Sequence, residues 1–273
     1  MYFDIKIIRK DGTSYDLSKL GYRVKNFDYP STNYNHTLQS VSTLGSTLVD
    51  TKTSETTLNL SLRIFASNNF ELELKRVELN RIFSSYETFY IISGRLPYLR
   101  WEVVAQPFTM PQLANSSFAD VSINLTCPGG YAESVGTTQD EFNYFYGVWG
   151  MANGLPNAAD LKYSFQNNTN FKVFNASVIP LKADERPVTI RFTGTVLNKL
   201  TITNKTTNQV FIYNTKIEPT DVFYLKGLIP IKNDSQDYWA SNHGYIDLVP
   251  GWNEFTIAGA SDFKIDFITR FYY

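Results

Sequence analysis

Histidine and cysteine, which often act in catalysis and metal binding, are rare in this chain, and their spacing defines no site. The 273 residues include two histidines, His36 and His243, and one cysteine, Cys127. Neither histidine has a second ligand-type residue at the spacing of zinc sites, so we expect no metal. Ser241, His243 and Asp247 could be imagined as a hydrolase triad. No Gly-x-Ser-x-Gly elbow or oxyanion motif accompanies them, so we interpret this segment as a polar loop between strands.

Carboxylates are the remaining candidates for catalysis. A glycoside hydrolase needs two carboxylates facing one groove. Four carboxylates are candidates, but no sequence pattern singles them out: Glu218, Asp221, Asp247 and Asp266. No glycine-rich phosphate-binding pattern occurs, so nucleotide binding has no support. Cys127 ends an alternating apolar segment and is interpreted as a buried thiol. We therefore predict no enzyme activity, no catalytic residue and no cofactor, with a glycoside hydrolase as a remote alternative.

Aromatic side chains suggest a different kind of site. They make up 15% of the chain, and Trp149, Trp239 and Trp252 all lie in its second half. Rings of this type can stack on sugars, so a carbohydrate-binding β-sandwich that docks on cell-wall glycans is an alternative function. The run Phe142–Trp149 fits a packing strand equally well. Exposure of at least two of the three tryptophans on one concave face would favour the sugar-binding alternative.

Charge and hydropathy exclude several classes of partner. Lys and Arg number 25 against 26 Asp and Glu, a net charge of -1, which offers no electrostatic surface for nucleic acid or an anionic membrane. The segment Met1–Lys10 has charges inside its apolar run and is predicted to be a first strand rather than a signal peptide. No apolar run approaches the roughly 20 residues of a membrane helix. We expect a soluble protein made in the cytoplasm.

The first half of the chain, residues 1–130, is predicted to be a β-rich domain with one helix. Leu58, Leu60, Leu62 and Ile64 alternate as in a strand. A helix is expected over Asn69–Ser84, with Asn68 as N-cap and Glu71 three residues further on. Its predicted apolar face consists of Leu72, Leu74, Val77, Leu79, Ile82 and Phe83.

The polar stretch Ser31–Thr57 is predicted to be a long hairpin that projects from this domain, with its tip near Leu44-Gly45-Ser46. An extended hairpin of this length cannot bury its own apolar side chains, so they need a partner surface. We therefore predict an oligomer interface at five positions: Leu38, Val41, Leu44, Leu48 and Val49.

The second half is predicted to be a β-sandwich over residues 142–273, after a linker at 131–141. Short alternating segments such as Val188–Phe192 and Leu200–Ile202 recur about every ten residues without a helix, which is typical of sandwiches. The final 25 residues are predicted to contain a Pro-Gly turn, a strand, a turn at Gly259 and a last strand.

Taken in order, these segments resemble the distal tail protein family of long-tailed phages that infect Gram-positive bacteria. The resemblance rests on the hairpin 31–57, the strand 58–64, the helix, the strand ending Cys127-Pro128, and the turn Leu248-Val-Pro-Gly-Trp-Asn253 before the terminal segment. It implies an N-terminal ring domain whose hairpin, the belt, reaches a neighbouring subunit, and a galectin-like or jelly-roll sandwich outside the ring.

The resemblance also implies a structural function in the virion. Six subunits would form a hub between the tail tube and the tail tip or baseplate. Implied partners are the tail tube protein, the tape measure protein, the tail-associated lysin and the receptor-binding proteins, with no nucleic-acid sequence recognition and no membrane insertion.

Overall fold

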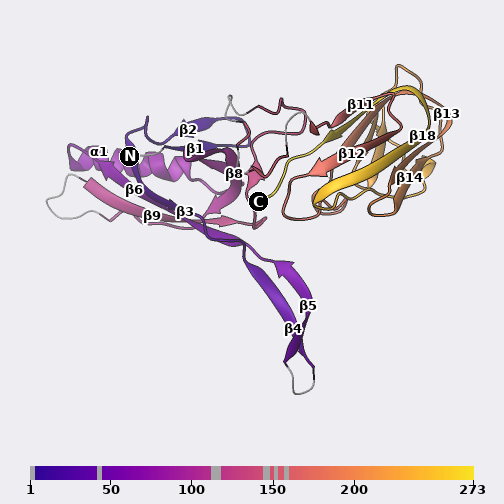
Figure 1. Cartoon of the computed structure of the whole chain (residues 1–273). Coiled ribbons are helices and arrows are strands. Elements are labelled where there is room, and N and C mark those ends of the chain that lie inside the picture. Colours follow the sequence, from indigo (N-terminus) through magenta and orange to yellow (C-terminus); the bar gives the residue numbers. More distant parts are fainter. Residues whose placement is uncertain (1–3, 42–44, 112–117, 144–147, 151–152, 157–159) are drawn as a thin grey trace. The chain divides into compact units, whose positions relative to one another are not determined.

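The computed structural model describes residues 4–41, 45–111, 118–143, 148–150, 153–156 and 160–273. The chain divides into two compact units, Met1–Glu133 and Ser134–Tyr273 (Figure 1). Regular structure is mainly β, and α1 is the only α-helix in the described ranges, so the predicted fold class is confirmed. The division lies inside the segment predicted to be a linker. There, the Ser134 N–H donates to the Phe271 carbonyl at 2.8 Å.

The first unit contains an eight-stranded sheet and a separate hairpin. The strand order is β2-β1-β7-β8-β9-β6-β3, with β10 beside β8. The bounds are β1 (Ile5–Ile8), β2 (Ser14–Asp16), β3 (Tyr22–Asp28), β4 (Tyr34–Ser40), β5 (Ser46–Thr53), β6 (Thr56–Phe65), α1 (Asn69–Ile82), β7 (Phe89–Ser93), β8 (Leu96–Ala105), β9 (Phe118–Cys127) and β10 (Glu133–Ser134).

Strand β6 lies between β9 and the edge strand β3. It pairs antiparallel with β9 along its full length, from Thr56 opposite Cys127 to Phe65 opposite Phe118. The predicted alternation is confirmed, because Leu58, Leu60, Leu62 and Ile64 are all fully buried. Cys127 is buried at the end of β9, as its apolar position indicated.

Helix α1 begins as its sequence predicts. The Asn68 side chain accepts the Glu71 N–H at 2.9 Å, and the Glu71 carboxylate accepts the Ser67 N–H at 2.7 Å. Leu72, Leu79 and Ile82 are buried. The predicted apolar face is wrong at Leu74 and Val77, which are exposed. The 3.6-residue period places these two side chains on the side of the helix opposite its buried row.

The second unit contains one eight-stranded sheet and a large aromatic core. The order is β11-β18-β13-β15-β16-β17, with β12 also paired to β18 and β14 to β13. The bounds are β11 (Ser164–Gln166), β12 (Asn170–Asn175), β13 (Thr189–Asn204), β14 (Gln209–Tyr213), β15 (Phe223–Lys226), β16 (Ile229–Lys232), β17 (Ser235–Gln236), the 3-10 helix η3 (Tyr238–Ala240) and β18 (Gly251–Ile268).

Two long bent strands hold this unit together, which corrects the predicted strand count. The segments expected on either side of Gly259 form the single strand β18, and those at 188–192 and 200–202 join in β13. Gly259 has a φ of +81°, and a Cβ there would lie 1.9 Å from the Lys199 carbonyl oxygen. Glycine therefore bends a continuous strand at this position instead of reversing the chain.

Candidate assembly surfaces

Strands β4 and β5 form a hairpin that projects from the sheet of its own unit, as predicted for Ser31–Thr57 (Figure 1). They pair only with each other, and every residue in both strands is exposed. Two-stranded hairpins are at best marginally stable in water. Because both faces of this hairpin are exposed, it has no covering layer, unlike every other long strand pair in the described chain.

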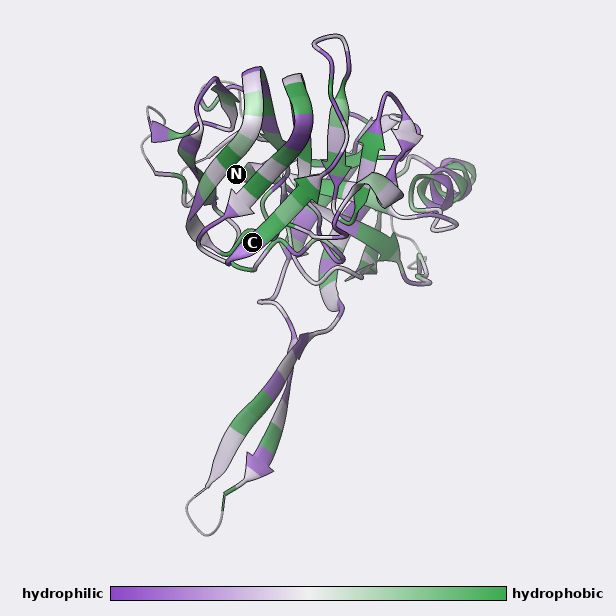
Figure 2. Cartoon of the chain, turned by 90° about the vertical axis from the view of Figure 1, so that its right-hand side faces the viewer, coloured by the Kyte–Doolittle hydropathy of each residue, from purple (hydrophilic) through white to green (hydrophobic). Residues whose placement is uncertain are grey.

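The residues predicted to form an oligomer interface lie on this hairpin. Leu38, Val41, Leu48 and Val49 are each more than half exposed, and Leu44 lies outside the described residues. Figure 2 shows green, hydrophobic segments along both arms of the hairpin. Their contact with another subunit stays a prediction.

The strand register gives the hairpin two different faces. Leu38 lies opposite Leu48, and His36 opposite Thr51, so these side chains share one face with Tyr34. Within the two paired strands the opposite face is polar: Asn35, Thr37, Gln39, Thr47, Asp50 and Lys52. Val49 is the extra residue at a bulge between the two parts of the register. The hairpin is thus an amphipathic ribbon with both faces open.

The base of the hairpin is anchored by residues just after β9. The Tyr131 hydroxyl lies 2.9 Å from Thr53 Oγ1 and 3.2 Å from the Tyr34 hydroxyl. Gly130 has a φ of +72°, and a Cβ there would lie 2.6 Å from Thr53 Cγ2. The Pro128–Tyr131 segment, at the predicted junction between the first domain and the linker, therefore fixes the base of the hairpin. No local pattern could reveal this, because the contact joins residues 78 positions apart.

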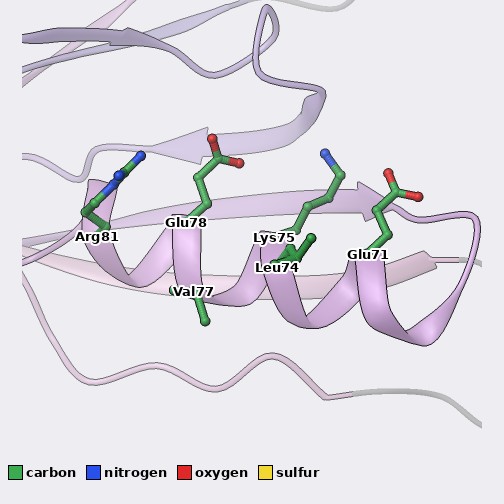
Figure 3. A pocket seen from close by; sticks show the side chains of 6 residues that line it. All are labelled: Glu71, Leu74, Lys75, Val77, Glu78 and Arg81. Atoms are coloured by element: carbon green, nitrogen blue, oxygen red, sulfur yellow. The ribbon is translucent and has the colours of Figure 1, made fainter.

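A second exposed apolar surface lies on α1. Phe70, Leu74 and Val77 are 74%, 55% and 66% exposed. Beside them, a shallow depression of about 450 Å³ is lined by Glu71, Leu74, Lys75, Val77, Glu78 and Arg81. Figure 3 shows the four charged side chains rising along one side of the helix, with Val77 pointing away from them.

One charged residue of this row is held by the sheet. Glu78 Oε2 accepts a hydrogen bond from the Tyr22 hydroxyl at 2.6 Å. Burial, together with this carboxylate, raises the pKa of Tyr22 well above its usual value. Tyr22 is therefore a neutral donor at physiological pH and anchors the charged side of α1 to β3.

The three tryptophans predicted as a sugar-stacking platform have different environments. Trp149 is 1% exposed and stacks on Phe142 at 4.8 Å. The prediction is wrong for this residue, because a ring inside the core has no free face. Trp239 is 88% exposed beside Tyr238, and Trp252 is partly exposed against Phe174.

The imagined triad of Ser241, His243 and Asp247 is engaged in other contacts. The Ser241 hydroxyl donates to the Tyr238 carbonyl at 2.8 Å, and the Asp247 carboxylate accepts the Ala183 N–H at 2.8 Å. The His243 ring stacks on Tyr238 at 4.2 Å. Within the described ranges, no three His, Cys, Asp or Glu side chains gather as a metal site requires. In that same part of the chain, no helix is long and apolar enough to cross a membrane.

Comparisons with known proteins give these surfaces a context. Residues 10–127 match the family described as phage tail protein RIFT-related domain. The whole chain is similar to the Dit protein of phage SPP1, described as a paradigm of the hub adsorption apparatus in phages that infect Gram-positive bacteria. That match has 12% identity, a TM-score of 0.68, and covers 98% of this chain and 99% of the other.

Weaker similarity extends to chains of the phage P2 baseplate in its activated conformation. The structure with calcium has 6% identity and a TM-score of 0.48. The structure with strontium has 8% identity and a TM-score of 0.49, and each match covers 98% of both chains. No curated protein matches this chain.

These findings show what the chain is similar to. Residues 10–127 match a phage tail domain. Over its full length it has the fold of the SPP1 Dit protein. The resemblance to distal tail proteins inferred from the sequence is confirmed.

Proposed function

We propose that six copies of this chain form the ring of a distal tail hub, which joins the tail tube to the tail tip or baseplate. The tail domain at residues 10–127 and the Dit-like fold support a place at the end of the tail. The observation that carries the proposal is the fully exposed β4–β5 hairpin, whose apolar face is covered by no other part of its unit.

A ring follows from the way the hairpin projects. An arm on one copy that contacts the body of the next makes a head-to-tail contact, which closes as a ring when the rotation allows it. A two-fold contact would stop at a dimer. Each subunit contributes one arm and one body, so every copy has the same environment. The role is structural, and the second unit is free to carry tip or receptor-binding components.

The mass of the assembled protein tests this function. We expect light scattering on the wild-type protein to give six times the subunit mass of 31.2 kDa, with ring-shaped particles in negative stain. A shortened variant joins Thr37 to Asp50, which are cross-strand partners, through a two-residue Asn-Gly turn. It should keep both units folded and remain monomeric.

Two outcomes would contradict the proposal. A hexamer formed by the shortened variant would show that assembly does not need the hairpin. A wild-type protein that stays monomeric at every concentration up to its solubility limit would show that this chain forms no ring by itself. The matched control is Gln39→Lys with Thr47→Lys, both on the polar face, which should assemble normally.

Sugar binding by the second unit is a second candidate function, which the exposure of Trp239 favours. The loop carrying this ring is well anchored, because the Asn242 side chain accepts the Ile212 N–H at 2.9 Å and donates to the Val210 carbonyl at 3.0 Å. Binding to cell-wall glycan that is lost in Trp239→Ala but kept in Trp252→Ala would support it. The sugar-binding function would be rejected if wild type and both variants bound the glycan equally, or if none of them bound it.

A further inference from the structure

Helix α1 has two apolar faces although only one is covered. Leu72, Leu79 and Ile82 pack inward. Phe70, Leu74 and Val77 follow one another at i, i+4 and i+7 and therefore form one stripe on the opposite side. Outside the hairpin, this is the only run of three largely exposed apolar side chains at such spacing in the described part of the first unit. Exposed apolar patches of this kind mark interaction sites.

The apolar face of the hairpin matches this stripe in length and character. Tyr34, His36 and Leu38 span roughly 13 Å at about 3.3 Å per residue. The stripe from Phe70 to Val77 spans roughly 10 Å at 1.5 Å per residue. The hairpin face carries no carboxylate or lysine among its described residues, so no charge would be buried without a partner against the helix.

We propose that the Leu38–Leu48 face of one copy packs on the Phe70–Leu74–Val77 stripe of a second copy. The inference rests on the proposed ring and names the surface that receives the arm. Both surfaces are open within the described part of the first unit, and each copy carries one of each, which is the requirement of a repeating head-to-tail contact.

The charged side chains beside the stripe would lie at the edge of this contact. Glu71, Lys75, Glu78 and Arg81 alternate in sign along one side of it (Figure 3). The His36 imidazole lies on the docking face together with Tyr34 and Leu38, and a glutamate of this row can accept its N–H. Asp50 and Lys52 lie on the opposite face of the ribbon and would stay in water.

Site-directed crosslinking tests the contact in the full chain. Leu38→Cys combined with Leu74→Cys, treated with a short bismaleimide, should give a ladder of covalent oligomers up to six subunits. Native Cys127 is buried and serves as an unreactive background. Gln39→Cys combined with Leu74→Cys places the hairpin thiol on the polar face and should give a much weaker ladder.

The outcomes separate this inference from the proposed function. A hexamer by light scattering with no ladder from the first pair, or with equal ladders from both pairs, overturns the docking surface and leaves the ring intact. A protein that is monomeric throughout overturns both.

A second variant covers the case in which cysteines disturb the arm. Leu74→Lys should raise the concentration needed for assembly at least tenfold. Val178→Lys, at an apolar position of similar exposure in the second unit, should leave it unchanged. Equal assembly of the two variants would count against the helix as the receiving surface.

Discussion

In β13 and β18, residues at every second position over most of their length are buried in the core of the second unit, whereas every residue of β4 and β5 faces solvent. Both pairs are antiparallel, and both place apolar side chains across from one another, Ile202 opposite Ile257 in one and Leu38 opposite Leu48 in the other. Local strand rules therefore apply equally to both ribbons.

The difference between the ribbons lies in what covers them. The β13–β18 ribbon has aromatic side chains of other strands packed against it, including Phe171 of β12, whose ring lies 5.8 Å from that of Phe267 in β18. Among the described residues, the β4–β5 ribbon is held at its base by the Gly130–Tyr131 anchor. The apolar face of the hairpin is exposed in the described part of the chain, and we propose that the next subunit covers it.

The largest difference should appear in the stability of the dissociated protein. Phe267→Ala removes a fully buried ring and should cost about 3–5 kcal/mol of unfolding free energy. Leu48→Ala should cost less than about 0.5 kcal/mol, because the exposed hairpin contributes no core packing. Urea denaturation of both variants checks this. A cost for Leu48→Ala close to that of Phe267→Ala would mean that the hairpin packs within its own chain.

The sidedness of the hairpin should govern assembly. Leu48→Lys places a charge on the apolar face and should weaken the ring at least tenfold, while Thr47→Lys on the polar face should have little effect. Sedimentation velocity over a concentration series measures the difference. Equal weakening by both substitutions would show that the whole ribbon is enclosed, and the two-faced interpretation would fail.

The anchor should be sensitive to a single methyl group. Gly130→Ala should lower the stability of the first unit by about 1–3 kcal/mol through overpacking against Thr53, in addition to the strain of its positive φ. Gly12→Ala is the matched control, since Gly12 also has a positive φ, +87°, but no atom within 4 Å of an added Cβ. Equal costs in thermal unfolding would mean that the anchor contact contributes nothing.

The smallest effect should come from the charges that join β3, β6 and β9. Asp120 accepts two hydrogen bonds from Arg63, each at 2.7 Å, and one from Lys25 at 3.0 Å. The Arg63 guanidinium, with Lys25, holds the pKa of Asp120 well below its usual value.

Because this folded-state pKa is depressed, the contribution is present above about pH 4, the range of an unfolded aspartate, and is lost as pH falls through the folded value. Asp120→Asn should cost less than about 1 kcal/mol at neutral pH, and the difference from wild type should shrink in acid. Asp50→Asn, in the exposed pair with Lys52, should change stability less at any pH. A cost for Asp120→Asn that stays constant from pH 7 to acid would contradict the assignment.

Much of the fold could be predicted from the sequence, and the exceptions have a common cause. Alternation identified β6 and β9 because each buries one face, and Asn68 with Glu71 identified the start of α1 because a cap is a local structure. Gly259 was predicted to be a turn, since a bend and a reversal use the same residue type. The open face of Leu74 and Val77, and the Gly130–Tyr131 anchor, depend on which segments pack together in three dimensions.

The candidate surfaces were also predictable where the signal is local and not where it depends on tertiary packing. The hairpin was predictable because polar residues interspersed with Leu38 and Leu48 cannot form a core of their own. Its two faces were not, because the bulge at Val49 shifts the register between strands. The burial of Trp149 was also not predictable, since a ring that packs inside a sandwich and one that stacks on a ligand have the same sequence signature.

Hydrogen exchange of the hairpin amides tests the central claim most directly. Samples of wild-type protein above and below the concentration of assembly would be compared over residues 34–40 and 46–53. We expect these amides to exchange rapidly in the dissociated protein, because the uncovered hairpin opens readily, and to become strongly protected on assembly, while those of β13 and β18 stay protected in both samples. Hairpin amides that exchange equally fast in the ring and in the free subunit would contradict the claim that the hairpin joins one subunit to the next.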